Sequence, residues 1–178
     1  GFGVDFNPVP NALRVLGDAE ENFRLTFPAG ASAMGVYDVF ADGAINPGGS
    51  ATTAAYTNNF DGATATRLYV VDTVSNQLKY QNPPNDGTQT VVGPLGITIA
   101  GPDAGLDIIG GAGVNAATPA DIGTNIGNTV TYAALSVGGN TNLYRVNLQT
   151  GAATQIGATP VGGASPVALK GLAVRGRK

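Results

Sequence analysis

The chain has 178 residues, which suits one domain or one compact array of small β units. It contains no Cys and no His, so disulfides and thiolate chemistry are excluded and the commonest general base and metal ligand is missing. Only 12% of the residues are charged and the net charge is -3, so we expect no nucleic-acid partner. No apolar run reaches the roughly 20 residues that a membrane span needs.

Alternating apolar and polar residues, separated by Gly, Pro and Asp-Gly turns, predict strands along the whole chain. In chain order the predicted strands are residues 3–7, 12–16, 23–27, 36–40, 52–57, 66–72, 77–81, 88–92, 97–100, 106–109, 129–137, 143–148, 153–156 and 169–174. The clearest turn signal is at 82–87, where two prolines fix φ and Asp86-Gly87 suits a tight turn. The one helical turn that we expect is at 119–122, so the predicted class is all-β.

A strand-turn-strand unit occurs twice. Leu68-Tyr69-Val70-Val71-Asp72 returns as Leu143-Tyr144-Arg145-Val146-Asn147, each followed by a polar turn and another strand. The spacing predicts antiparallel four-stranded units near 3–50, 52–93 and 105–157, with 169–174 as a first strand without partners. We therefore predict a single all-β domain over 1–178. Its repeats form an incomplete propeller-like array or close as a β-sandwich or barrel.

One stretch carries a family resemblance. Residues 3–15, GVDFNPVPNALRV, resemble a GVDFNPVPDRLRV-type run found in a family of secreted bacterial domains of unknown function. Further matches are Ala55-Tyr56-Thr57-Asn58, the Leu68–Asp72 strand and Pro83-Pro84-Asn85-Asp86-Gly87-Thr88. The last part of the chain, at 143–157 and 171–174, is also similar to the end of that family's sequences.

This resemblance implies propeller-like repeats and secretion. Family members usually have another propeller-like stretch before the first run, and this chain lacks it; Asn11 and Ala12 also replace the usual Asp-Arg pair. The family has no established reaction, so it implies no catalytic residues. Because the chain opens on Gly1 rather than Met, we interpret it as a processed or truncated product of an exported precursor. The predicted location is extracellular or at the cell surface.

Candidate chemistry is sparse. Asp5, Asp72, Asp86 and Asp107 are predicted at strand ends or turns, where Asp usually binds its own backbone, although a pair can also serve acid–base work or Ca²⁺. The tyrosines suit packing better than a sugar platform. We predict no catalytic residues, no cofactor and no metal.

The two ends of the chain carry the functional prediction. The extended segment 1–7 and the strand 169–174 are almost uncharged, and an open sheet edge is a template for another chain. We expect residues 1–7 to be an N-terminal strand that can be exchanged between subunits, unless the two ends pair within one subunit. The predicted subunit interface comprises Phe2, Val4, Phe6, Leu172 and Val174.

These observations predict a non-catalytic extracellular structural protein. Its copies would assemble by β-strand addition into a filament or surface layer, because a contact that does not close a ring propagates. One alternative is a surface module that binds a glycan or protein through loops such as 58–63 and 110–128. A less favoured alternative is a hydrolase that uses an Asp pair.

Overall fold

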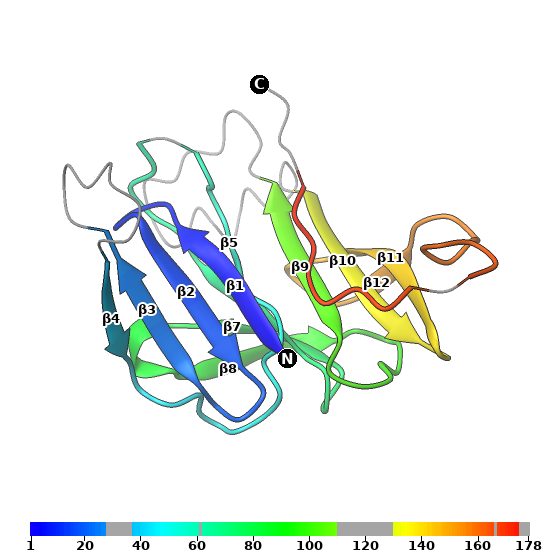
Figure 1. Cartoon of the computed structure of the whole chain (residues 1–178), viewed down its shortest axis with the longest axis horizontal. Helices are drawn as coiled ribbons and strands as arrows, with labels where there is room; N and C mark the ends of the chain where they lie inside the picture. The colour runs from blue at the N-terminus through cyan, green and yellow to red at the C-terminus, as the bar shows by residue number, and fades with distance from the viewer. Residues whose placement is uncertain (28–36, 61, 110–129, 166, 175–178) are drawn as a thin grey trace.

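The computed structural model describes residues 1–27, 37–60, 62–109, 130–165 and 167–174 (Figure 1). These residues form three four-stranded antiparallel sheets, and none of the three closes into a barrel, so the predicted class is confirmed. The predicted helical turn at 119–122 lies outside the described residues. Within the described part of the chain, no helix has the length and hydropathy of a membrane span.

In each sheet the strands follow one another in chain order. The first sheet contains β1 (Phe2–Asn7), β2 (Ala12–Gly17), β3 (Asn22–Thr26) and β4 (Asp38–Ala41). The second sheet contains β5 (Ala55–Tyr56), β6 (Leu68–Asp72), β7 (Gln77–Gln81) and β8 (Gln89–Pro94). The third sheet contains β9 (Ala104–Ile109), β10 (Val130–Val137), β11 (Asn140–Val146) and β12 (Ala153–Gln155).

The structure confirms the turn at 82–87 and corrects two of the predicted strands. The turn at 82–87 contains a short 3-10 helix, η1 (Pro84–Asp86), which ends at Gly87 in the left-handed region at φ +71°. A Cβ at Gly87 would also lie 2.1 Å from the Ala44 carbonyl oxygen. Both the positive φ and this close contact therefore require glycine at position 87. Residues 97–100 and 169–174 are not strands, because neither segment forms a ladder with another described segment.

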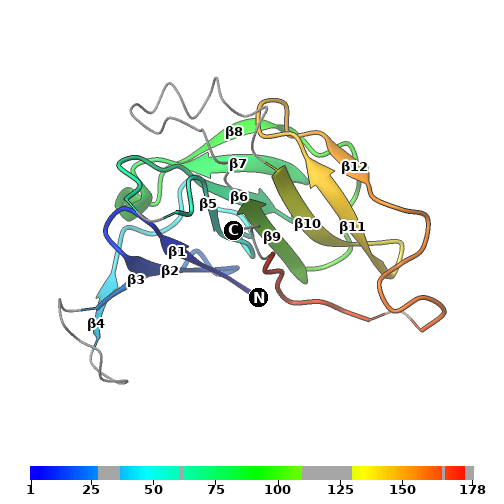
Figure 2. The same cartoon turned by 90° about the horizontal axis from the view of Figure 1, so that it is seen from above.

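The second sheet is the middle layer of the molecule (Figure 2). Its strand β6 is buried on both faces, since all five of its residues are buried. Tyr56, Leu68 and Val70 pack with Leu16 of the first sheet, whereas Tyr69 and Val71 pack with the third sheet. Alternation along β6 therefore divides the core into two apolar clusters, one on each side of the middle sheet.

A buried polar cluster joins the first sheet to the second. Arg14, which is 2% exposed, donates to Asp42 Oδ2 at 2.6 Å and to Asn22 Oδ1 at 2.7 Å. Its other terminal nitrogen donates to Asn85 Oδ1 at 2.6 Å, beyond β7. Because a buried guanidinium must be neutralised and hydrogen-bonded, these partners make the junction specific.

Candidate functional site

The first sheet has one face that no other part of the described chain covers. Strand alternation directs Gly3 and Asp5 of β1 toward the second sheet and places Phe2, Val4 and Phe6 on the opposite side. Phe2 is 58% exposed, Val4 is 52% exposed and Phe6 is 44% exposed. The N-terminal half of the predicted interface is thus on the surface, as an interface requires.

The apolar character continues across all four strands. The strand register aligns Val4 with Val15, Phe23 and Ala41, and it aligns Phe6 with Leu13, Leu25 and Val39. Direct partners in an antiparallel ladder share a face, so both rows lie on the same side of the sheet. We call this surface the outer face; it comprises Phe2, Val4, Phe6, Leu13, Val15, Phe23, Leu25, Val39 and Ala41.

None of these side chains is polar. The four from β2 and β3 are half-buried between their neighbours, whereas Val39 at the edge is 57% exposed. Phe27 extends the surface, since its ring lies 5.9 Å from the ring of Phe6. In Figure 2 the second sheet lies on one side of the first sheet, and no described strand lies on the other. The apolar side chains of the outer face therefore form one contiguous patch rather than scattered single residues.

The third sheet shows how the same face behaves when it is covered. Gly3-Val4-Asp5-Phe6 of β1 corresponds to Gly105-Leu106-Asp107-Ile108 of β9. Leu106 and Ile108 hold the places of Val4 and Phe6, yet they are only 4% and 2% exposed because the second sheet packs on them. Within the described residues, one sheet face of this type is thus covered by a neighbouring sheet and the other is not.

The two aspartates of this repeat join neighbouring segments. Asp5 Oδ2 accepts the Tyr56 N–H at 2.6 Å, and its Oδ1 accepts the Phe6 N–H at 2.8 Å. Asp107 does the same with the N–H groups of Val174 and Ile108. Burial raises the pKa of Asp5 to about 6, against the two N–H groups that lower it, and the charge of Asp107 raises it further.

The glycines of the repeat permit this close approach. A Cβ at Gly3 would lie 2.1 Å from the Thr53 carbonyl carbon, and a Cβ at Gly105 would lie 2.6 Å from the Gly171 carbonyl carbon. Residues 171–174 therefore run along β9 as residues 53–56 run along β1. Leu172 and Val174, the C-terminal half of the predicted interface, are half-buried in this position, whereas Gly171 and Ala173 are exposed.

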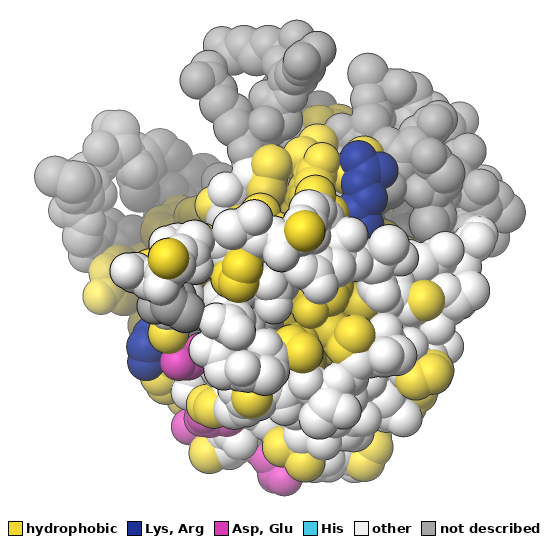
Figure 3. Space-filling model, turned by 90° about the vertical axis from the view of Figure 1, so that its right-hand side faces the viewer, with side chains coloured by type: hydrophobic (Ala, Val, Ile, Leu, Met, Phe, Trp, Pro, Cys, Tyr) yellow, Lys and Arg dark blue, Asp and Glu magenta, His cyan; other side chains and the backbone are white. Residues whose placement is uncertain are grey.

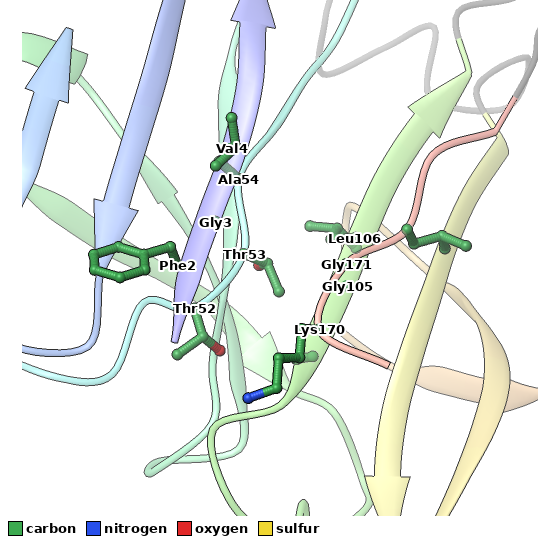
Figure 4. A pocket seen from close by; sticks show the side chains of 12 residues that line it. Phe2, Gly3, Val4, Thr52, Thr53, Ala54, Gly105, Leu106, Lys170 and Gly171 are labelled. Carbon is green, nitrogen blue, oxygen red and sulfur yellow. The ribbon is translucent and has the colours of Figure 1, made fainter. Parts of the chain in front are cut away.

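Four segments consequently meet around one groove of about 170 Å³ (Figure 4). Its lining consists of residues 2–4, 52–54, 104–106 and 170–172, three consecutive residues from each segment. The central residue of each segment is Gly3, Thr53, Gly105 or Gly171. Gly3 lies close to the backbone of Thr53, and Gly105 lies close to the backbone of Gly171. The groove is thus a product of the repeat, and its walls are mainly backbone and small side chains.

The prediction that the carboxylates lie at strand ends or turns is correct for Asp72 and Asp86 and incomplete for Asp5 and Asp107. Asp72 accepts the N–H groups of Val74 and Ser75 and binds Lys79 Nζ at 2.6 Å. Burial opposes its ionisation, but the bonds from Lys79 and Ser75 prevail and lower its pKa. Asp5 and Asp107 lie inside strands and bind across to neighbouring segments, a role that the repeated Gly-x-Asp signal reveals only when β1 and β9 are aligned.

Among the described residues, no three acidic side chains lie close enough together to hold a metal ion. The predicted packing role of the tyrosines fits Tyr56, Tyr69 and Tyr144, which are buried. Tyr37, by contrast, is 51% exposed. Of the two predicted binding loops, 58–63 is described apart from residue 61, and all of 110–128 lies outside the described residues.

Comparison with known proteins places the chain in a family. No curated protein and no solved structure matches it. The family model called Domain of unknown function (DUF4394) matches residues 1–173, which is almost the whole chain and includes the outer face, both aspartates of the repeat and the groove. The chain belongs to this family of domains of unknown function, DUF4394.

Proposed function

We propose that this chain is a non-catalytic structural subunit that joins other subunits through the outer face of its first sheet. The observation that carries the proposal is the outer face itself, which is wholly apolar, spans four strands and is covered by no other described part of the chain. Exposed apolar surface costs free energy in water at roughly 25 cal/mol per Å², so its burial drives association. The extracellular setting is part of the proposal and is supported by the low charge and the lack of Cys.

The disposition of the carboxylates supports a structural role over a hydrolytic one. Asp5 and Asp107 each use both oxygens to accept backbone N–H groups, and Asp72 is paired with Lys79. A general acid or base needs an oxygen that can reach a substrate proton at hydrogen-bond distance. The engaged carboxylates instead fasten one segment of the fold to the next.

Growth into a filament or surface layer requires a second contact besides the outer face. Strand addition at 1–7 and 169–174, the predicted mode, is the candidate for that contact. In the single chain β1 pairs with β2 along all six residues, and Asp5 binds Tyr56, so exchange of β1 would have to break these bonds first. Packing of the outer face demands no such opening and is therefore the first step of the proposed assembly.

The test is sedimentation velocity of the chain over a wide concentration range, compared with a Val39→Asp variant. Val39 lies on the outer face and is 57% exposed, so the substitution should leave the fold intact while placing a charge in the contact. The matched control is Val74→Asp, because Val74 is 75% exposed in the β6–β7 turn, away from the outer face. A chain that stays monomeric at every concentration would refute the proposal.

A further inference from the structure

We propose that a cavity at the junction of the first and second sheets binds a small hydroxylated carboxylate, a sugar acid, through the guanidinium of Arg24. The strand register aligns Arg24 with Arg14 and Asp5, so its side chain is on the inner side of the first sheet, opposite the outer face. Binding in this cavity is therefore independent of the proposed association through the outer face.

The cavity has a volume of about 350 Å³ and lies where three segments of the chain meet. The inner side of β2 and β3 contributes Arg14 and Arg24, the β1–β2 turn contributes Pro10, and the β7–β8 turn contributes residues 83–86. Small-molecule sites measure roughly 300–1,000 Å³ and combine apolar walls with a few polar groups. The prolines at 10, 83 and 84 supply apolar walls beside the two guanidiniums, so the cavity has this composition.

The guanidinium of Arg24 is held in place and still has unused donors. The Phe40 ring lies 4.5 Å from its central carbon, and its Nε and Nη2 donate to the Asp42 carboxylate at 3.2 Å each. Within the described part of the chain, Nη1 has no acceptor. A guanidinium fixed in this way is suited to a carboxylate, which accepts two parallel N–H bonds from its planar fork.

The positive charge at this wall of the cavity exceeds the negative charge that neutralises it. Arg14 and Arg24 share Asp42, and neither forms an ion pair with another acid among the residues that the structure describes. The Arg14 and Asp42 side chains are 2% and 7% exposed, so water and salt screen their charges weakly. A ligand carboxylate on Arg24 would supply the missing negative charge.

A role for Arg24 in binding also explains why a second guanidinium is present at the junction. Arg14 reaches Asp42 at 2.6 Å and Arg24 only at 3.2 Å, so Arg14 is the main link between the sheets. The whole chain has only 9 Lys and Arg residues. On the side of the third sheet, charged side chains lie in a few separate places on a largely neutral surface (Figure 3). Two guanidiniums in one cavity therefore form a local concentration of positive charge.

Two other groups of the lining indicate the rest of the ligand. Asn85 Oδ1 accepts a bond from Arg14 at 2.6 Å, which leaves its Nδ2 as a donor. The exposed Asp86 carboxylate forms no ion pair with a described residue. Ligand hydroxyl groups can accept from Asn85 and donate to Asp86. A phosphate would bring more negative charge beside Asp86 and be repelled, so a single carboxylate on a hydroxylated ring fits better.

The experiment is a titration of the full chain, followed by isothermal calorimetry and by the NMR shifts of backbone amides. The probes are glucuronate and galacturonate, and the matched neutral ligands are glucose and galactose, which have the same rings without the carboxylate. Arg24→Met removes the guanidinium. Arg67→Met is the control, because Arg67 also stacks on an aromatic ring, 4.8 Å from the Tyr80 centroid, and does not line the cavity. Thermal unfolding shows whether each variant remains folded.

At least one uronate should bind the unmodified chain at millimolar or lower concentration, and its neutral counterpart should bind at least about tenfold more weakly. Arg24→Met should weaken uronate binding at least about tenfold, and Arg67→Met should not. Failure of both uronates to bind would overturn the proposal. Equal binding of glucose or galactose, of inorganic phosphate, or of serine would also overturn it, as would an equal loss in the two arginine variants.

Discussion

Asp5 and Asp107 stand at equivalent positions of two sheets and make equivalent bonds. Each carboxylate accepts the N–H of the residue that follows it and the N–H of a residue in an adjacent segment, Tyr56 for Asp5 and Val174 for Asp107. The sequence Gly-x-Asp thus combines a close approach of two backbones with an acceptor that fastens them. This pair of bonds is the link between the repeat in the sequence and the groove at the centre of the molecule.

The pKa of Asp5 leads to a pH dependence of stability. Burial raises this pKa from 3.8 to about 6 in the folded chain, so the folded state holds its proton more tightly than the unfolded state. The contribution of Asp5 to the free energy of unfolding is therefore greatest below about pH 4, and it falls as the pH rises toward about 6. At about 1.4 kcal/mol per pKa unit, the loss is on the order of 3 kcal/mol.

Asp5→Asn tests this directly. The amide keeps an oxygen for the Tyr56 N–H and cannot ionise, so the decline in stability between about pH 4 and pH 6 should be reduced in the variant. Urea unfolding at several pH values measures both profiles. Parallel profiles for the two proteins would show that Asp5 is not the group responsible.

The close backbone contacts at Gly3 and Gly105 predict that alanine will destabilise the fold at these two positions and not at Gly171. Gly3→Ala and Gly105→Ala would bring Cβ to 2.1 Å and 2.6 Å from neighbouring backbone atoms, which cannot yield as a flexible side chain would. Each should cost about 1–3 kcal/mol of unfolding free energy. Gly171→Ala is the matched control, since its Cβ would meet nothing within 4 Å. Thermal unfolding distinguishes them, and equal effects at all three positions would contradict the repeat geometry.

The junction of the first and second sheets depends on Arg14. Arg14→Met removes the 2.6 Å ion pair with Asp42 and the bond to the buried Asn22 side chain, so Asn22 Oδ1 loses this donor and Asp42 loses its buried cation. We expect a loss of about 3–5 kcal/mol, the usual result of breaking a buried pair. Arg24→Met removes a weaker ion pair with the same Asp42, in which the Arg24 Nε–Asp42 Oδ2 distance is 3.2 Å and the Arg24 side chain is 28% exposed. Its loss should lower the free energy of unfolding by about 0–1 kcal/mol. A comparable loss in both variants would refute the central role of Arg14.

The Asp72–Lys79 pair gives a test by a double-mutant cycle. Lys79→Met leaves Asp72 buried without its cation and should cost about 3–5 kcal/mol, although two N–H groups still bind the carboxylate. Adding Asp72→Asn should recover part of this loss, because the uncompensated charge is then gone. The low pKa of Asp72 also means that its stabilisation is lost as the pH falls, so Lys79→Met should weaken that acid sensitivity. Strictly additive effects in urea unfolding would rule out the coupling.

The sequence by itself determined the class and the repeat. Strand alternation and Gly, Pro and Asn turns are local signals, and they located three sets of four strands as well as the family resemblance. They also identified Phe2, Val4 and Phe6 as apolar residues on one side of β1, since period two requires no knowledge of the rest of the fold.

Only the tertiary structure decided which faces are covered. Val4 and Leu106 look alike in the sequence, yet one is exposed and the other buried, because a neighbouring sheet packs on β9 and no sheet of the described residues packs on the outer side of β1. Residues 97–100 and 169–174 are predicted as strands from the sequence, but neither has a ladder partner among the residues that the structure describes, and a strand exists only through pairing. The aspartates of the repeat likewise acquire their role from Tyr56 and Val174, which are distant in sequence and close only after folding.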